Sequence, residues 1–328
     1  MVTGMGLTRC YRDGRLIDED FPVAQVSDYL EQDDTVVWFD LLQPTEEDLA
    51  ALSEELGLHP LAVEDAVHPH QRPKLDHYAS HQFLTAYSAK LNDATGELET
   101  NEVAAFILPR ALVTVRKDDG FDMKDVIARW DAADQHLMAS GVPFLLYGLV
   151  DHIVDSHFDV MQRLDTDLDA LEESLFSDQI KDKQVQRRTY ELRKSLVMMR
   201  RVVEPMREVV STLMRPDLHI IDQETTPYFQ DVYDHVLRAT EWTDSLRDLV
   251  GNIHETHLTV RSNRLNVITK QVTSWAAIIA VPTAITGFYG QNVPYPGFGQ
   301  HWGFWVSSSV TIVLAVILYI AFRRRDWL

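Results

Sequence analysis

The 328-residue sequence has only one cysteine, Cys10. A single thiol cannot form a disulfide within the chain, and it excludes a metal cluster built on cysteines. The sequence also lacks a Gly-rich phosphate loop, a nucleophile elbow and the H-E-x-x-H pair of a zinc hydrolase. Five histidines do cluster between His59 and His81, but prolines interrupt the run and the spacing differs from that pair. We therefore expect no enzymatic activity.

Charge is absent from one long segment of an otherwise acidic chain. The formal net charge is -20, yet residues 271–322 contain no Asp, Glu, Lys or Arg. A bilayer core requires about 20 apolar residues per helix. The segment therefore has room for two membrane spans, which we place at 272–290 and 303–322. The alternative is a buried helical hairpin inside a soluble protein.

Basic residues flank the outer ends of both predicted spans. Arg264 and Lys270 precede the first span, and three arginines from Arg323 onward follow the second. Because Lys and Arg are enriched on the cytoplasmic side of membrane proteins, we expect a multi-pass protein of the plasma (inner) membrane with both termini cytoplasmic. The loop 291–302 then lies outside the cell, and 323–328 form a basic cytosolic tail.

Residues 1–270 are strongly acidic, with 49 Asp and Glu against 27 Lys and Arg. No basic patch suggests nucleic acid as a partner, and the N-terminal residues contain no apolar run typical of a secretory signal. We expect this cytosolic part to comprise an α/β domain at 1–145, a helical hairpin at 146–226 and a stalk helix at 227–271.

Local patterns predict several of the elements. Runs of β-branched and aromatic residues at 35–42 and 111–117 are typical of strands. Residues 45–57 begin with a Thr cap before acidic residues and end at Gly, as a helix does. Long helical patterns follow at 141–176 and 183–213, and we expect these two helices to be antiparallel partners.

Acidic side chains gather on the first of these long helices. Asp151, Asp155 and Asp159 begin a run of acids that ends at Asp178. Runs of this kind usually form a solvated face, although they can also concentrate cations near a cytosolic opening.

A third helical pattern runs from residue 227 to 289, which is about 90 Å at 1.5 Å per residue and too long for one globular domain. One of its faces, followed in steps of three and four, carries only small or polar residues. We call this face the polar stripe. Its members are Asn252, Glu255, Thr259, Ser262, Asn266, Thr269, Thr273, Ala276, Ala280, Thr283 and Gly287.

The polar stripe continues from the predicted stalk into the first span, where it must face something other than lipid. Its mean step of 3.5 residues suits a supercoiled helical bundle. It either lines a water-filled pore or allows close packing between helices through small residues. Packing explains Glu255 and Asn266 less well than a pore does. Since two spans per chain are too few to enclose a pathway, a pore would require a ring of identical chains.

A neutral polar cluster of Tyr289, Gly290, Gln291 and Asn292 follows the first span. Mg²⁺ is small, prefers octahedral oxygen ligands and gives up its water reluctantly. A ring of Asn amide oxygens can accept hydrogen bonds from the water of a hydrated cation, without the tight binding of a carboxylate ring. Gly, Asn and Pro are also ordinary turn residues. The residues alone leave a selectivity loop and a plain turn equally open.

Several longer stretches resemble one family. They are "HPLAVEDAVHPHQRPK", "PYFQDVYDH", "SNRLNVITK" and "GFYGQN", together with Pro282 in the first span. On these the chain resembles the CorA family of divalent-cation channels over nearly its full length. The resemblance implies a homopentamer with an α+β cytosolic funnel domain, a long stalk helix and two C-terminal transmembrane helices per protomer. It implies passive influx of Mg²⁺, and of Co²⁺ or Ni²⁺, through a pore that the first span lines.

The resemblance also implies candidate metal ligands. Asp65 and Asp231 match the positions of an intersubunit regulatory Mg²⁺ site, and Glu64 and His235 match those of a second, weaker one. Asn266 matches a pore-lining ligand for hydrated ions. Mg²⁺ is then both regulator and cargo, and the expected partners are divalent cations, membrane lipid and further copies of the chain.

The loop triplet departs from the Gly-Met-Asn that is usual in this family, because Gln291 occupies the middle position. Gln is similar in length to Met but polar, and zinc-transporting relatives also vary here, so zinc is an alternative cargo. A different class of function also stays open, namely a membrane-anchored metal sensor that does not conduct. The polar stripe argues against it, since an anchor has no reason to align Asn266, Thr269 and Thr273.

Overall fold

The computed structural model describes residues 6–68, 71–175, 182–291 and 293–328. The chain forms two compact units, Met1–Gly251 and Asn252–Leu328. The first unit contains the sheet and most of the helices, and the second contains the apolar C-terminal part.

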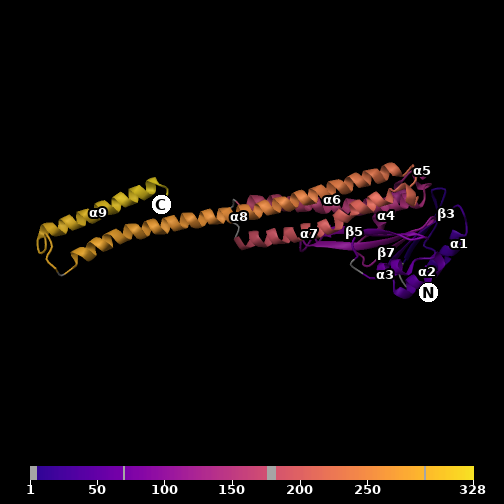
Figure 1. Cartoon of the computed structure of the whole chain (residues 1–328), viewed down its shortest axis with the longest axis horizontal. Coiled ribbons are helices and arrows are strands. Elements are labelled where there is room, and N and C mark those ends of the chain that lie inside the picture. The colour runs from indigo at the N-terminus through magenta and orange to yellow at the C-terminus, as the bar shows by residue number, and fades with distance from the viewer. Residues whose placement is uncertain (1–5, 69–70, 176–181, 292) are drawn as a thin grey trace. The chain divides into compact units, whose positions relative to one another are not determined.

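A seven-stranded mixed sheet forms the centre of the first unit (Figure 1). The strand order is β2-β1-β3-β7-β6-β5-β4. β3 pairs with β7 in parallel, and the other neighbours pair antiparallel. The strands are β1 (Gly6–Arg12), β2 (Arg15–Glu19), β3 (Thr35–Leu42), β4 (Lys74–His77), β5 (Gln82–Leu91), β6 (Leu98–Ile107) and β7 (Ala111–Arg116).

Helices pack on both faces of this sheet. One face is covered by α2 (Glu46–Leu56) and α3 (Pro60–Val67). On the other face, α4 (Met123–Ala132), α6 (Val142–Leu175), α7 (Asp182–Leu213) and the beginning of α8 (Thr226–Tyr289) share one hydrophobic core with the sheet. The remaining helices are α1 (Val26–Leu30), α5 (Gln135–Met138), α9 (His301–Arg324) and two 3-10 turns at Val23–Gln25 and Pro216–Leu218.

Alternation along the strands produces two separate cores, because successive side chains point to opposite faces. In β3, Val37 and Phe39 pack toward α2 and α3, whereas Trp38 packs toward α4 and α6. The rings of Trp38 and Trp130 meet edge to face at 4.9 Å. Each large side chain buried in this way contributes about 1.5–3 kcal/mol. Cys10 is fully buried in the core on the α2 and α3 side.

The shorter predicted elements are confirmed. The strand at 35–42 has the predicted limits, and the strand predicted at 111–117 ends one residue earlier, at Arg116. Thr45 caps α2 through a reciprocal capping box with Asp48, which satisfies backbone donors of the first turn. Gly57 ends the helix in the left-handed region, with φ of 65°, which glycine adopts without a Cβ penalty.

The long helices are also confirmed, with small shifts at their ends. The helix predicted at 141–176 begins at Val142 because Gly141 has φ of +70°. The next helix begins at Asp182, and α8 begins at Thr226, one residue before its prediction. α8 is continuous to Tyr289, so the predicted stalk and first span are parts of one helix. The predicted α+β domain with a long helix and two C-terminal apolar helices is therefore confirmed.

The second unit consists of the remainder of α8, a loop and α9. Both helices contain a window of 18 residues apolar enough to cross a membrane. Only 6 % of the α8 window and none of the α9 window is buried. A hairpin in the core of a soluble protein would be mostly buried, so this alternative does not fit the structure.

Candidate functional site

The carboxylate of Asp65 lies in the last turn of α3, beside strand β4. The helix starts at Pro60 because the His59 side chain accepts a hydrogen bond from the Leu61 amide. Lys74 of β4 places its Nζ 2.6 Å from Asp65 and 2.7 Å from Asp76. Burial lowers the pKa of Lys74, but the two carboxylates outweigh it and the net pKa is raised. Asp65 therefore faces a cation that belongs to its own chain.

A second lysine holds the end of α3 against the sheet. Lys117 Nζ donates to the Asp65 carbonyl at 3.1 Å and also to the His68 carbonyl. Its charge is balanced by Glu102, whose carboxylate lies 2.5 Å away and is almost fully buried. A cation at a helix C-terminus satisfies carbonyl groups that the helix leaves without partners. Sequence reasoning did not identify this arrangement, although it fixes the turn that carries Asp65.

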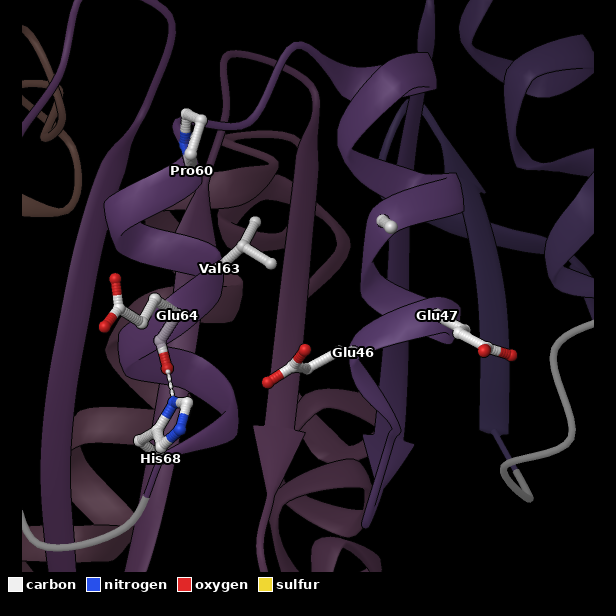
Figure 2. A pocket seen from close by; sticks show the side chains of 7 residues that line it. Glu46, Glu47, Pro60, Val63, Glu64 and His68 are labelled. Carbon is white, nitrogen blue, oxygen red and sulfur yellow. Dashed lines mark hydrogen bonds between the residues drawn. The ribbon is translucent and has the colours of Figure 1, made fainter.

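Glu64, the neighbour of Asp65, is exposed. It lines a pocket of about 580 Å³ between α2 and α3, together with Glu46, Glu47, Val63 and other residues (Figure 2). In Figure 2 the Glu64 carboxylate lies on the side of α3 away from α2, while its carbonyl accepts from the His68 ring at 3.0 Å. The pocket is open, and Glu64 does not meet other carboxylates there in a closed metal site.

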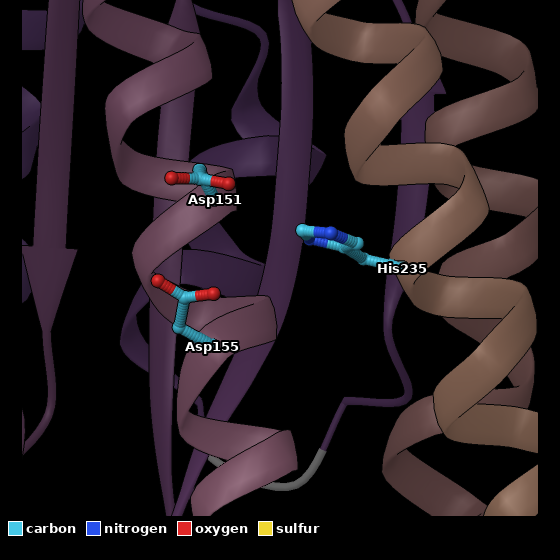
Figure 3. Close-up of side chains that lie close together, drawn as sticks. All are labelled: Asp151, Asp155 and His235. Carbon is cyan, nitrogen blue, oxygen red and sulfur yellow. The ribbon is translucent and has the colours of Figure 1, made fainter.

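A second acidic group lies between α6 and α8. Asp151 and Asp155 are one turn apart on α6, and His235 faces them from α8 (Figure 3). One ligand atom from each of the three residues lies within 4.8 Å of the others. His235 Nε2 is also 3.7 Å from the carboxylate of Asp231, one turn earlier on the same helix. His235, one of the two predicted metal residues of α8, therefore meets two acids of the run that the sequence left open as a solvated face or a cation-concentrating surface.

Arg129 of α4 occupies the acidic side of this group. Its two terminal nitrogens bind one carboxylate each, Nη1 that of Asp151 and Nη2 that of Asp155. Burial raises the pKa of Asp151, and the charge of Asp155 adds to this, while Arg129 and His235 oppose it. The signal for this group in the sequence was a pair of residues four apart on each helix, because such residues share a helix face. The pairs are Asp151 with Asp155 on α6 and Asp231 with His235 on α8.

The predicted pore residues are all exposed within the single chain. Thr259 and Thr283 donate their hydroxyls to carbonyls four residues earlier in α8, at 3.0 and 2.9 Å. Neighbouring apolar residues such as Val272 are exposed as well, with 62 % of its surface accessible. The polar stripe of one chain therefore has no enclosing wall, and its role in a pore stays a prediction. The stripe residues concerned are Glu255, Thr259, Ser262, Asn266, Thr269, Thr273, Ala280, Thr283 and Gly287.

The predicted selectivity loop begins at the last turn of α8. Tyr289 ends the helix, and Gly290 and Gln291 follow it, whereas Asn292 lies outside the described residues. The Tyr295 hydroxyl donates to the Tyr289 carbonyl at 2.9 Å, and the two rings meet edge to face at 5.0 Å. This contact closes the first part of the loop onto the helix end.

A family model identifies the chain. The model of the CorA-like Mg²⁺ transporter protein family matches residues 33–324. The chain belongs to this family. The cobalt/magnesium transport protein CorA of Thermotoga maritima is 32 % identical over 278 residues, which cover 84 % of this chain and 79 % of that protein.

Solved structures of similar chains agree with the CorA-like fold. The superposition on the complete structure of the CorA magnesium transporter from Methanocaldococcus jannaschii covers 100 % of both chains, with a TM-score of 0.77 and 23 % identity. The cytoplasmic domain of ZntB from Vibrio parahaemolyticus covers 70 % of this chain and 88 % of that one, with a TM-score of 0.52 and 16 % identity. Identities this low show a shared fold and do not select the ion.

Membership of the CorA-like family confirms the resemblance found in the sequence. With two exposed apolar helices, a member of a transporter family is a membrane protein. No ion pair or hydrogen bond among the described residues joins Asp65 to Asp231. The expected contact between them is one between subunits, so this assignment stays a prediction.

The donor atoms of the α6 and α8 group fit a divalent cation. Carboxylate oxygens are ligands for Mg²⁺, and an imidazole nitrogen suits Co²⁺, Ni²⁺ or Zn²⁺ better. Asp151, Asp155 and His235 together offer both kinds of donor. By donor type, the group therefore suits either a hard or a borderline divalent ion.

Proposed function

We propose that this CorA-like chain forms a homopentameric channel for passive influx of Mg²⁺, and of Co²⁺ or Ni²⁺. It would lie in the plasma (inner) membrane as a multi-pass protein with both termini in the cytoplasm. The observation that carries the proposal is the continuity of α8, one helix that includes Asp231 near its start, the exposed polar stripe and Tyr289 at its end.

Selection of the ion takes place at the loop that follows α8. In this proposal Gly290 lets the backbone approach closely, and amide oxygens of Asn292 accept hydrogen bonds from a hydrated ion. Asn266 and the hydroxyls of the polar stripe then offer further neutral oxygens along the pore. Neutral oxygens leave the water of Mg²⁺ in place, which matters because this ion dehydrates reluctantly.

Cytosolic Mg²⁺ regulates the channel in this proposal. An ion that bridges Asp65 of one subunit and Asp231 of the next offsets the repulsion of the two carboxylates and favours a closed ring. Glu64, His235 and the α6 acids form a second place for the ion. When cytosolic Mg²⁺ falls, the carboxylates repel each other and the ring opens.

Flux into liposomes tests the conducting role. Purified protein should admit Mg²⁺, and Asn292→Ala should reduce this flux, whereas Gln300→Ala removes an exposed amide near α9 and should have little effect. Flux that survives Asn292→Ala unchanged would remove Asn292 from ion selection. Protein that carries no divalent ion at all would instead favour the membrane-anchored sensor.

Protease protection tests the regulatory role. Mg²⁺ should protect the wild type from proteolysis, and Asp65→Ala combined with Asp231→Ala should abolish the protection. Asp234→Ala, at an exposed acid of the same helix segment, serves as the matched control and should keep it. Equal protection of the double variant and the wild type would show that these two acids are not the sensor.

A zinc-transporting relative is the second candidate within the same class. The observation that favours it is the position of His235 beside Asp151 and Asp155, because imidazole is a preferred ligand of zinc. Comparing Mg²⁺, Co²⁺ and Zn²⁺ in the same liposomes decides between them. Faster flux of Zn²⁺ than of Mg²⁺ would select this candidate.

A further inference from the structure

Both proposed regulatory positions contain a cation that belongs to the chain itself. Lys74 of β4 pairs with Asp65 of α3, and Arg129 of α4 pairs with Asp151 and Asp155 of α6. In each case the basic residue and its acid come from different elements of the fold. The two arrangements are independent of each other, since they share no residue.

We propose that Lys74 and Arg129 are tethered cations, which compete with divalent cations for these carboxylates and set the Mg²⁺ concentration at which the sites fill. This inference rests on the proposed regulatory function. It concerns residues that touch the metal ligands and does not add further ligands.

Geometry makes the competition direct at the α6 site. Arg129 donates to a carboxylate oxygen of both Asp151 and Asp155, and the side chain of His235 reaches the same space from α8 (Figure 3). A divalent ion needs these oxygens at about 2.0–2.6 Å. The ion and the guanidinium would draw on the same two carboxylates, and their like charges repel. In this proposal Arg129 therefore gives way when the ion binds.

Exposure allows Arg129 to leave. Its side chain is 38 % exposed and that of Asp155 is 40 % exposed, whereas that of Asp151 is 13 % exposed. Pairs that solvent reaches contribute little to stability, so the arginine side chain can turn away from Asp155 into water at small cost, and the main cost lies at Asp151, which the arriving ion would neutralise. The pair of Arg116 with Asp40 is a contrast, because Asp40 is fully buried and separating that pair would leave a charge without water.

Lys74 has a second acceptor ready when a metal takes Asp65. Its Nζ lies 2.7 Å from the carboxylate of Asp76, two residues later on the same strand. An ion that binds Asp65 therefore leaves the ammonium of Lys74 paired. This arrangement lowers the cost of exchange at Asp65 but still requires the ion to displace a charge.

The test is a Mg²⁺ titration of protease protection with the full-length protein in detergent. Arg129→Gln and Lys74→Gln each remove one tethered cation while keeping a polar side chain of moderate length. We expect the midpoint concentration to fall in each variant by up to about fivefold, since ion pairs that solvent reaches contribute differences of up to this order. Arg163→Gln, at an arginine of α6, removes an exposed pair with Asp93 of the loop after β5 and should leave the midpoint unchanged.

Arg129→Lys provides a further variant, because it keeps the charge but reaches fewer acceptors. Its midpoint should lie between those of the wild type and Arg129→Gln. Thermal unfolding gives a second measurement. Without metal, Arg129→Gln should unfold at a lower temperature than the wild type, because Asp151 and Asp155 then repel each other, and saturating Mg²⁺ should restore it.

The outcomes separate this inference from the function on which it rests. Suppose that Mg²⁺ protects the wild type and not Asp231→Ala, so that the sensor stands. The competition by Lys74 and Arg129 is then refuted if the midpoints of Arg129→Gln and Lys74→Gln match that of Arg163→Gln or lie above it. If Arg129→Gln is destabilised equally with and without Mg²⁺, Arg129 is only structural. If Mg²⁺ protects neither the wild type nor any variant, the proposed sensor itself fails.

Discussion

Replacing Lys117 by Met, alone and together with Glu102→Gln, should separate two roles of one buried lysine. Lys117 balances the charge of Glu102 at 2.5 Å and donates to the carbonyls of Asp65 and His68 at the end of α3. Its side chain is 13 % exposed and that of Glu102 is 6 % exposed. The methionine keeps the length of the side chain and removes both roles together.

The magnitude follows from the burial of the pair. Removing one partner of a buried ion pair costs about 3–5 kcal/mol. The Tyr87 hydroxyl still donates to Glu102 at 2.7 Å, so we expect the lower end, about 3 kcal/mol. For a unit of this size, 1 kcal/mol corresponds to about 2–4 °C in the unfolding temperature, which predicts a fall of about 6–12 °C.

A double variant distinguishes the two roles. Lys117→Met with Glu102→Gln removes the buried negative charge, so it should recover most of the lost unfolding temperature. It leaves the carbonyls of α3 without their donor, so the turn that carries Asp65 should stay loose. The midpoint of Mg²⁺ protection should therefore remain higher than in the wild type for both variants.

The assays are thermal unfolding in the absence of metal and the Mg²⁺ titration of protease protection. Lys90→Met, at an exposed lysine of strand β5, is the control and should match the wild type in both. The reasoning is refuted if Lys117→Met unfolds within about 2 °C of the wild type, because a loss of only about 1 kcal/mol would already lower the unfolding temperature by about 2–4 °C. A double variant with the wild-type Mg²⁺ midpoint would show that Lys117 does not position Asp65.

Three further changes test other parts of the structure. His157 is fully buried, and burial lowers its pKa to about 4. An unfolded histidine titrates near 6.5, so the unfolded chain takes up this proton first as the pH falls. The free energy of unfolding should therefore be full above about pH 6.5 and fall by up to about 3 kcal/mol as the pH drops toward 4. Between pH 7 and 4.5, thermal unfolding of His157→Gln should show a smaller loss of stability than the wild type. An equal loss in both proteins would show that His157 is not its source. Tyr295→Phe removes the 2.9 Å hydrogen bond to the Tyr289 carbonyl, so it should cost about 1 kcal/mol and alter the ratio of Mg²⁺ to Co²⁺ flux in liposomes; an unchanged ratio would separate this bond from ion selection. Asp40→Ala leaves Arg116 buried without its carboxylate, so denaturant unfolding should show a loss of about 3–5 kcal/mol, and a loss below 1 kcal/mol would show that the pair is solvated.

Local signals were sufficient for most of the fold. The cap at Thr45 and the glycine at Gly57 define α2 because both act within one turn of the chain. The strand at 35–42 follows from a run of β-branched and aromatic residues. The two apolar helices follow from the absence of charge, which is a property of the sequence alone.

The site was predicted only in part, because its contacts join distant parts of the chain. Asp65 and His235 were identified through family motifs, whereas the approach of Asp151 to His235 depends on how α6 packs against α8. Nothing near Lys117 in the sequence predicts that it reaches the end of α3. The polar stripe was recognised by its period, and in the proposed pentamer its partners would be other chains.

The buried position of Cys10 has a practical consequence for mapping the pore. Burial raises the pKa of its thiol to about 11, and the reactive form of cysteine is the thiolate. In the folded protein Cys10 should therefore not react with maleimide or methanethiosulfonate reagents near neutral pH. Cysteines introduced one at a time along residues 255–287 can then be labelled in an otherwise natural chain, and the pattern of reagent access would trace which face of α8 meets water.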